Sequence, residues 1–147
     1  MAFAAPVLIS RAAPAADPQR QSFTVVVQDS EAAVSPADFL DHLTQGAQEA
    51  EDAPLYRDGK KIGLAETIVI VTRVAGDDVA GLIACSVELP EGNLLFHGSA
   101  HLAGLATGAA LPVVGGTGTY RGARGTVTLI AAEDGTHTTL NFDISME

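Results

Sequence analysis

The feature that most limits the possible folds is a series of short apolar, β-branched segments separated by turns rich in Gly, Asp and Pro. An Asp58-Gly59 pair, typical of a two-residue hairpin turn, joins two of these segments. The expected strands are residues 22–28, 55–62 as one hairpin, 65–74, 79–89, 93–102, 111–114, 125–132 and 137–145. About eight short strands at such regular spacing predict a β-sandwich or a β-barrel.

One short helix is expected between the first strand and the hairpin. Ser35 is a suitable N-cap and Pro36 suits the first helical position, and an apolar face follows, which predicts a helix ending near Gly46. Residues 29–52 hold seven of the eighteen acidic residues. The favoured interpretation of this acidic stretch is a solvated surface segment.

Length and charge limit the possible partners. A chain of 147 residues predicts a single domain, here a barrel over residues 22–147 after an Ala- and Pro-rich arm or lid over residues 1–21. The net charge of −10 argues against nucleic acid as a partner, because nucleic-acid binding needs a basic surface. No apolar run approaches the roughly 20 residues of a membrane span, and the lone Cys85 suits a reducing cytoplasm.

Two strands are apolar at every position, which a sheet wetted on one face does not require. They are residues 68–71 (Ile-Val-Ile-Val) and 82–85 (Leu-Ile-Ala-Cys). In an eight-stranded barrel, one face of each strand lines a lumen that is filled by side chains or holds one small ligand. The other face then needs a cover, and we expect a homo-oligomer, a dimer or a trimer, joined through the barrel walls.

The most distinctive stretch is the Gly-rich segment of residues 111–125. It lacks the spacing of a dinucleotide-binding loop, because Arg121 stands where the third glycine would be and a strand follows in place of a helix. The glycines are better explained by positive φ angles and close backbone approach in a tight corner. The residues expected to build this corner are Pro112, Gly115, Gly116, Thr117, Gly118, Arg124 and Gly125.

This segment resembles the signature of the dirigent and allene oxide cyclase superfamily. The strand at residues 93–98 and the hairpin at residues 55–63 resemble the same family. The resemblance implies an all-β fold, an eight-stranded antiparallel β-barrel. It also implies an apolar lumen that holds a reactive molecule until it cyclises or couples, without a metal or redox cofactor.

Two residues are candidates for catalysis. Glu66 shares a pleat face with Ile68 and Ile70, and if that face is the lumen, its desolvated carboxyl could act as a general acid. Tyr120 matches the aromatic position of the signature, where packing under the turn is the favoured role and a ligand contact the alternative.

Further residues are candidates for binding a small hydrophobic molecule in the lumen. They are Phe23, Ile68, Ile70, Cys85, Phe96, His97 and Phe142. No metal site is expected, because His97 and His101 would lie about 13 Å apart along a strand, too far to share one ion.

Three functions remain open on these grounds. The leading hypothesis is a cofactor-independent cyclase or isomerase that folds a polyketide-like or oxylipin-like substrate in the lumen, in natural-product biosynthesis. The second is a non-catalytic dirigent- or lipocalin-like barrel that binds and orients a ligand. The third is a barrel with a filled lumen and a structural role, which a cavity below about 300 Å³ would favour.

Overall fold

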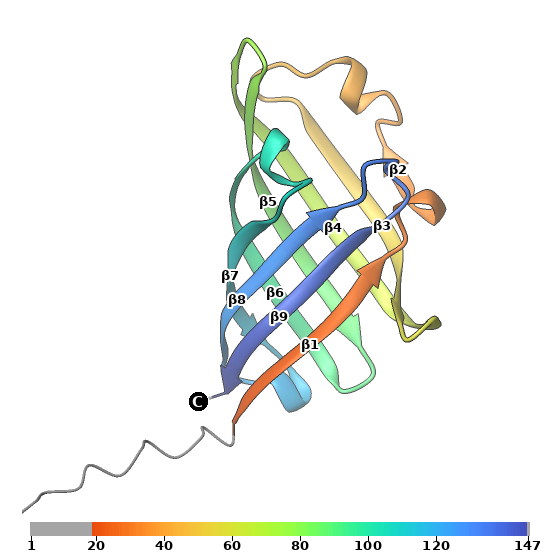
Figure 1. The fold of residues 1–147 in the computed structure, drawn as a ribbon, viewed down its shortest axis with the longest axis vertical. Helices are drawn as coiled ribbons and strands as arrows, with labels where there is room; N and C mark the ends of the chain where they lie inside the picture. Colours follow the sequence, from red (N-terminus) through yellow and green to blue (C-terminus); the bar gives the residue numbers. More distant parts are fainter. Residues whose placement is uncertain (1–18, 147) are drawn as a thin grey trace, which may run out of the picture.

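A computed structural model describes residues 19–146 of the chain as an antiparallel β-barrel (Figure 1). Eight strands form the barrel, a short ninth strand lies beside β3, and the remaining regular elements are single 3₁₀ turns. The strands are β1 (Arg20–Val27), β2 (Ala33–Ser35), β3 (Gln48–Arg57), β4 (Lys60–Ala75), β5 (Asp78–Leu89), β6 (Gly92–His101), β7 (Ala109–Gly116), β8 (Ala123–Ala131) and β9 (Thr138–Met146). The 3₁₀ turns are η1 (Asp29–Glu31), η2 (Phe39–Asp41), η3 (Leu102–Gly104) and η4 (Gly118–Tyr120). The predicted all-β, eight-stranded antiparallel barrel is therefore confirmed.

The strands from β3 to β9 follow one another as a meander, and β1 closes the barrel. It pairs with β9 along its whole length and with β3 at only two positions, Val26 with Tyr56 and Val27 with Leu55. The predicted hairpin turn is present, with φ of +51° at Asp58 and +74° at Gly59. Strand β1 begins at Arg20, and most of the predicted arm lies outside the described residues.

The predicted helix near residues 35–46 is wrong. Ala33–Ser35 instead pairs with β3, and the only helical turn that follows is the three-residue η2. The apolar face expected of that helix does not form, because Phe39 is buried at 6% exposure whereas Leu40 is 68% exposed. Free backbone groups on β3 offer β2 a ladder that an isolated short helix cannot match, since such helices are marginal in water.

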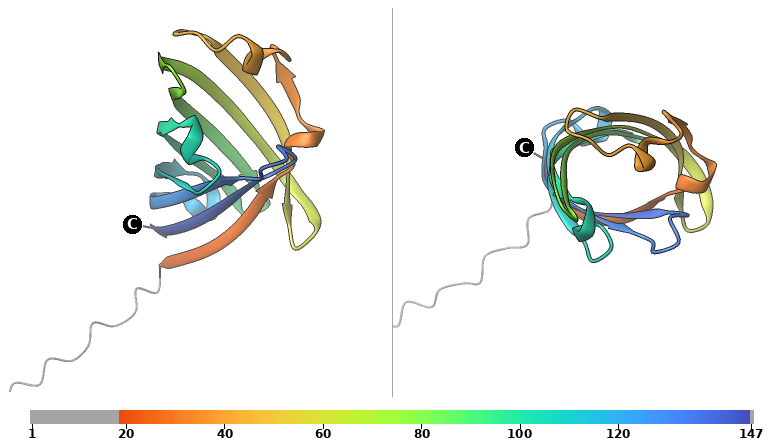
Figure 2. Two further views of the ribbon diagram at one scale, coloured as in Figure 1. Left: turned by 45° about the horizontal axis from the view of Figure 1, so that its top comes forward. Right: turned by 90° about the horizontal axis from the view of Figure 1, so that it is seen from above.

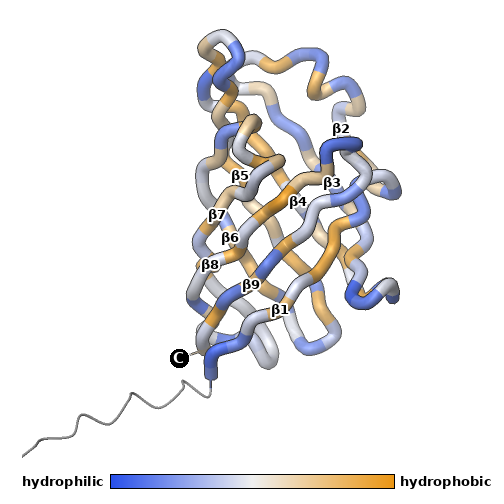
Figure 3. The backbone as a smooth tube through the Cα atoms, in the orientation of Figure 1, coloured by the Kyte–Doolittle hydropathy of each residue, from blue (hydrophilic) through white to orange (hydrophobic). Residues whose placement is uncertain are grey.

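Side chains alternate between the lumen and the outer wall along each strand, and hydrophobic residues recur along the strands (Figure 3). On β4 and β5 the inward positions include Ala65 and Val87, which are fully buried. The outward apolar positions are not buried within the single chain: Ile68 is 52% exposed and Leu82 is 41% exposed. The expectation that both faces of these strands are covered is thus not met within one chain.

Aromatic side chains pack together inside the barrel at the end that carries the η4 turn. The rings of Phe23 and Phe142 stack with centroids 5.1 Å apart, and those of Phe96 and Tyr120 lie 6.2 Å from Phe142 and 6.0 Å from Phe23 respectively. The guanidinium of Arg57 lies over the Phe23 ring, with its carbon 5.4 Å from the centroid. This end of the lumen is a packed core.

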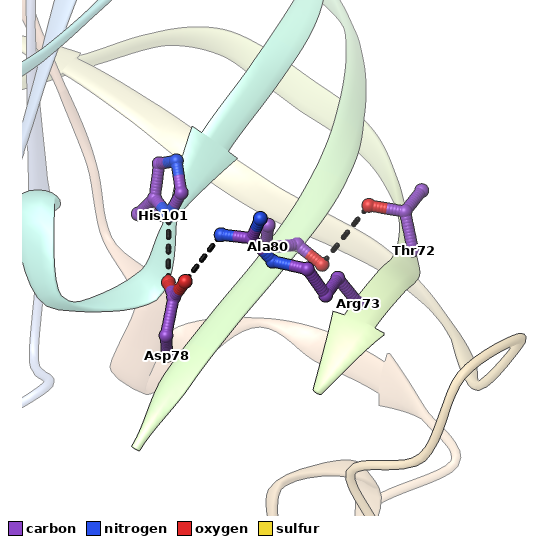
Figure 4. Close-up of polar contacts among 5 residues, drawn as sticks. All are labelled: Thr72, Arg73, Asp78, Ala80 and His101. Atoms are coloured by element: carbon purple, nitrogen blue, oxygen red, sulfur yellow. Dashed lines mark hydrogen bonds and ion pairs between the residues drawn. The ribbon is translucent and has the colours of Figure 1, made fainter. Parts of the chain in front are cut away.

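A small polar cluster fixes the upper end of the β4–β5 hairpin (Figure 4). The carboxylate of Asp78 accepts a hydrogen bond from Arg73 and lies 2.8 Å from Nδ1 of His101 on β6. The hydrogen bond with His101 and the nearby charge of Arg73 lower the pKa of Asp78. The cluster ties the hairpin to the strand that leads into η3.

Among the described residues, no helix is long and apolar enough to cross a membrane.

Candidate functional site: a lumen cavity with a carboxyl pair

A cavity of about 150 Å³ occupies the lumen above the aromatic cluster. Its walls are mostly aliphatic and come from strands all round the barrel. The apolar lining residues are Val27, Val69, Ile83, Phe96, Leu105, Leu129, Ala131 and Leu140. An engineered apolar cavity of about this size holds benzene, so this one has room for a single ring.

One side of the cavity is polar. Asp29, Glu51, Thr67 and Thr138 contribute to its lining, and none of the described Lys, Arg or His residues does. The carboxyl groups of Asp29 and Glu51 lie beside each other, close enough for a hydrogen bond between them to contribute to the raised pKa of Glu51. Thr138 donates from its hydroxyl to Oδ2 of Asp29 at 2.8 Å. Two carboxyl groups in contact hold one proton most stably between them, because two adjacent negative charges repel.

Burial and the neighbouring acids shift the pKa of Glu51 strongly. Desolvation is the largest cause, followed by the hydrogen bond and charge of Asp29, and together with Glu49 they raise the pKa to about 8. The pKa of Glu49, two residues earlier on the same strand, is also raised by burial and by Asp29. Glu51 therefore carries a proton at neutral pH, which makes it a hydrogen-bond and proton donor inside an apolar cavity.

The local sequence explains why these acids face inward. Glu49 and Glu51 occupy the same pleat face of β3 as Ala53 and Leu55, which are fully buried. Asp29 lies two residues after the last residue of β1, in the η1 turn between β1 and β2. The interpretation of residues 29–52 as a solvated segment is therefore wrong for these acids. Alternation of Glu49 and Glu51 with the two buried residues was the signal that could have found them.

The carboxyl pair alone does not make a metal site. Within residues 19–146, no group of three or more His, Cys, Asp or Glu side chains is arranged to hold a metal ion. The chemistry that the arrangement itself supports is proton donation and hydrogen bonding in a mostly apolar space.

Four of the predicted binding residues do face the lumen. Cys85 and Phe96 line the cavity, and Phe23 and Phe142 lie below it in the aromatic cluster. The Cys85 thiol accepts a hydrogen bond from Thr67 at 3.3 Å, and burial raises its pKa to about 12. Cys85 therefore lines the cavity and does not act as a nucleophile.

The structure places the other three predicted binding residues on the outer wall, together with the catalytic candidate Glu66. Glu66, Ile68 and Ile70 share the outward face of β4, and His97 is exposed on β6. Glu66, Ile68 and His97 instead line an open groove of about 660 Å³ that runs across the outside of β2 to β7. The strand is apolar at four successive positions, so its pattern could not say which face turns inward.

Tyr120 is 3% exposed and belongs to the aromatic cluster, apart from the acid pair. Burial, and then the charge of Glu91, raise the pKa of its phenol. Neither Tyr120 nor Glu66 lines the cavity.

The Gly-rich segment forms the corner between β7 and β8, through the η4 turn at the lower end. Gly118 has a φ of +58°, and Gly125 has a φ of +144°. A Cβ atom on Gly116 would lie 2.4 Å from the carbonyl oxygen of Tyr120.

Thr117 accepts a hydrogen bond from the backbone N–H of Asn93 at 3.0 Å. Arg124 donates to the carbonyl of Ala123 at 2.7 Å. Pro112 and Gly115 lie on β7. This segment builds the closed end and does not reach the cavity lining.

The cavity is smaller than the roughly 300 Å³ of typical ligand pockets, which is the property expected of a filled barrel. The carboxyl pair argues the other way. Two adjacent carboxyl groups that are partly removed from water destabilise the fold, and a purely structural lumen gains nothing from them. The volume and the polar lining together indicate a compact site that holds a small group or the reacting part of a larger molecule.

Known structures share the barrel. A pyocyanin demethylase superposes with a TM-score of 0.70 at 19% sequence identity, over 84% of this chain and 99% of that one. An exo-specific intermolecular Diels–Alderase superposes with a TM-score of 0.68 at 16% sequence identity, over 85% of this chain and 97% of that one. A pterocarpan synthase dirigent protein superposes with a TM-score of 0.62 at 14% sequence identity, over 97% of this chain and 100% of that one. At these identities the likeness establishes the fold.

The sequence comparisons are more specific about ancestry. No curated protein sequence matches the chain. The family model of the allene oxide cyclase barrel-like domain matches residues 28–145, which include the carboxyl pair, the cavity and the Gly-rich corner. The chain therefore belongs to the allene oxide cyclase-like barrel family.

Proposed function

We propose that the protein is a cofactor-independent cyclase or isomerase whose lumen holds the reacting part of a hydrophobic, polyketide-like or oxylipin-like substrate. The observation that carries the proposal is the position of Glu51 beside Asp29 at the polar side of an otherwise apolar cavity, where desolvation and Asp29 raise the pKa of Glu51. The fold is compatible with this role, since the barrel is shared with a Diels–Alderase.

The proposed mechanism has two parts. The cavity walls hold the reacting atoms close together. This lowers the entropic part of the activation free energy, because the substrate is already ordered when the reaction starts. Glu51 then donates its proton or a hydrogen bond to a substrate oxygen on which negative charge develops. Asp29, held by the hydroxyl of Thr138, accepts the hydrogen bond of Glu51 in the resting state and fixes its orientation.

The test begins with deletion of the gene in its native host and mass spectrometry of the metabolites. An uncyclised or isomeric precursor is expected to accumulate, and the purified protein alone is expected to convert it. Glu51→Gln is expected to lower turnover about 100-fold, because the amide cannot transfer a proton. Glu66→Gln is the matched control, since Glu66 lies on the outer wall and its loss leaves the lumen unchanged.

The second candidate function is a barrel that binds and orients a small ligand without catalysis, and the mostly aliphatic lining of the cavity favours it. Unchanged metabolites in the deletion strain, or conversion only with a second enzyme present, would support this function over the cyclase.

The outer groove supports a further part of the proposal, self-association. Three exposed apolar residues lie in it, Ile68, Leu95 and Val114, at 52%, 42% and 43% exposure. We expect a second copy of the chain to cover them. Leu95→Glu is expected to shift the protein from an oligomer to a monomer in light scattering, with Leu40→Glu, remote from the groove, as control.

A further inference from the structure

The η2 turn holds one buried aromatic side chain at the upper end of the barrel. Phe39 is 6% exposed, whereas its neighbour Leu40 is 68% exposed. Phe39 lies outside the contiguous core of the barrel. With Leu43 and Leu102, it surrounds a separate void of about 40 Å³.

This void and the lumen cavity are neighbours. Val69, Ile83 and Leu105 line both of them. Outward movement of Phe39 would therefore join the void to the cavity that Glu51 lines and widen the access from solvent on this side of the barrel. The same movement would add the space of the ring to the room available to a ligand.

The segment that carries Phe39, residues 36–47, runs over the upper rim of the barrel between β2 and β3 (Figure 2). Its last residues are hydrogen-bonded to β4. Gly46 donates to the carbonyl of Val71 at 2.8 Å, and Ala47 accepts from the N–H of Val71 at 2.9 Å.

The η2 turn itself is closed by hydrogen bonds within the segment. Phe39 donates to the carbonyl of Pro36 at 3.2 Å, and His42 donates to the carbonyl of Phe39 at 3.1 Å. The turn can therefore move as a unit without losing these bonds. Apolar packing of Phe39 holds it against the barrel, and such contacts open at lower free energy than strand ladders.

We infer that Phe39 is the gate of the lumen and sets the size of ligand that enters it. This inference rests on the proposed function, because it takes the lumen as the ligand site. It explains how a lumen with a cavity of only about 150 Å³ admits a larger molecule: the ring of Phe39 withdraws, and the void joins the cavity.

The test uses N-phenyl-1-naphthylamine, a neutral dye that fluoresces in apolar surroundings, in stopped-flow mixing with the full chain. Phe39→Ala is expected to speed association about tenfold, because the closed state loses its main contact. The association rate of Phe39→Leu is expected to lie between those of the unaltered protein and Phe39→Ala. Leu40→Ala is the matched control, and its association rate is expected to equal that of the unaltered protein. Toluene serves as a second, smaller probe, and its binding is expected to change little in all variants.

Thermal unfolding monitored by circular dichroism checks that each variant is folded. Equal association rates for Phe39→Ala and Leu40→Ala in folded proteins would overturn the gate and leave the proposed function intact. Failure of the unaltered protein and of Phe39→Ala to bind either probe would overturn both. Loss of turnover in Glu51→Gln with unchanged dye kinetics would separate the chemistry from the gate.

Discussion

Phe23 and Phe142 lie directly opposite each other on β1 and β9, and their rings stack at 5.1 Å in the lower lumen. Phe142 is 2% exposed and also contacts Phe96 edge-on. We expect Phe142→Ala to lower the free energy of unfolding by about 3–5 kcal/mol, as for other buried phenylalanines. Urea denaturation measures this change. Phe23→Ala is expected to cost less, since Phe23 is only partly buried, and an equal loss would contradict this account.

The raised pKa of Glu51 predicts a pH dependence of stability. The folded state holds the proton of Glu51 up to about pH 8, whereas the unfolded state releases it near the ordinary value of 4.5. Between these values the folded state binds more protons, so its stability falls as the pH rises. Thermal midpoints measured from pH 5 to pH 9 are expected to decline.

Glu51→Gln removes this titration and is expected to flatten the decline. Above pH 8 the variant should melt at a higher temperature than the unaltered protein, because no buried negative charge remains at this position. A decline of the same steepness in both proteins would show that the carboxyl pair is not its source.

Cys85 is expected to resist alkylation. Its pKa of about 12 leaves almost no thiolate at pH 8, and the side chain is buried in the lumen wall. Iodoacetamide treatment followed by intact-mass spectrometry is expected to leave the native protein unmodified and to add one group in denaturant. Rapid modification of the native protein would mean that the lumen is open to the reagent.

The Gly125 position is expected to tolerate no side chain. Its φ is +144°, and a Cβ atom would lie 2.2 Å from the carbonyl oxygen of Asp143. We expect Gly125→Ala to cost more than about 2 kcal/mol, from strain and displaced backbone. Gly135→Ala is the control, because Gly135 also has positive φ, at +72°, but has no atom within 4 Å of the Cβ position. Similar losses in the two variants would rule out the clash as the cause.

The sequence predicted the barrel well because the strands and their turns are local patterns. The Asp58-Gly59 turn needs only its own two residues to adopt positive φ, and both do. The inward face of β4 was not predictable in the same way. Its residues 68–71 are apolar on both sides, so the side that turns inward depends on the closure of the whole barrel.

The carboxyl pair was missed for a related reason. Asp29 and Glu51 are far apart in the sequence and meet only because β1 and β3 close the barrel. The acids around them favoured a surface segment, and the short β2 replaced the expected helix by pairing with β3. Both errors come from contacts between distant strands, which local composition does not record.

The β1–β3 pairing has a consequence for how the barrel opens. Two residue pairs join these strands, against eight pairs between β1 and β9 and three between β6 and β7. This joint is therefore the shortest in the cylinder, and its amides should exchange with solvent early. Asp29 and Glu51 stand on either side of that joint. Separation of the strands would part the two carboxyl groups and hydrate them, which favours their ionisation. Ionisation in turn makes the groups repel each other, so alkaline pH and opening of the joint favour one another.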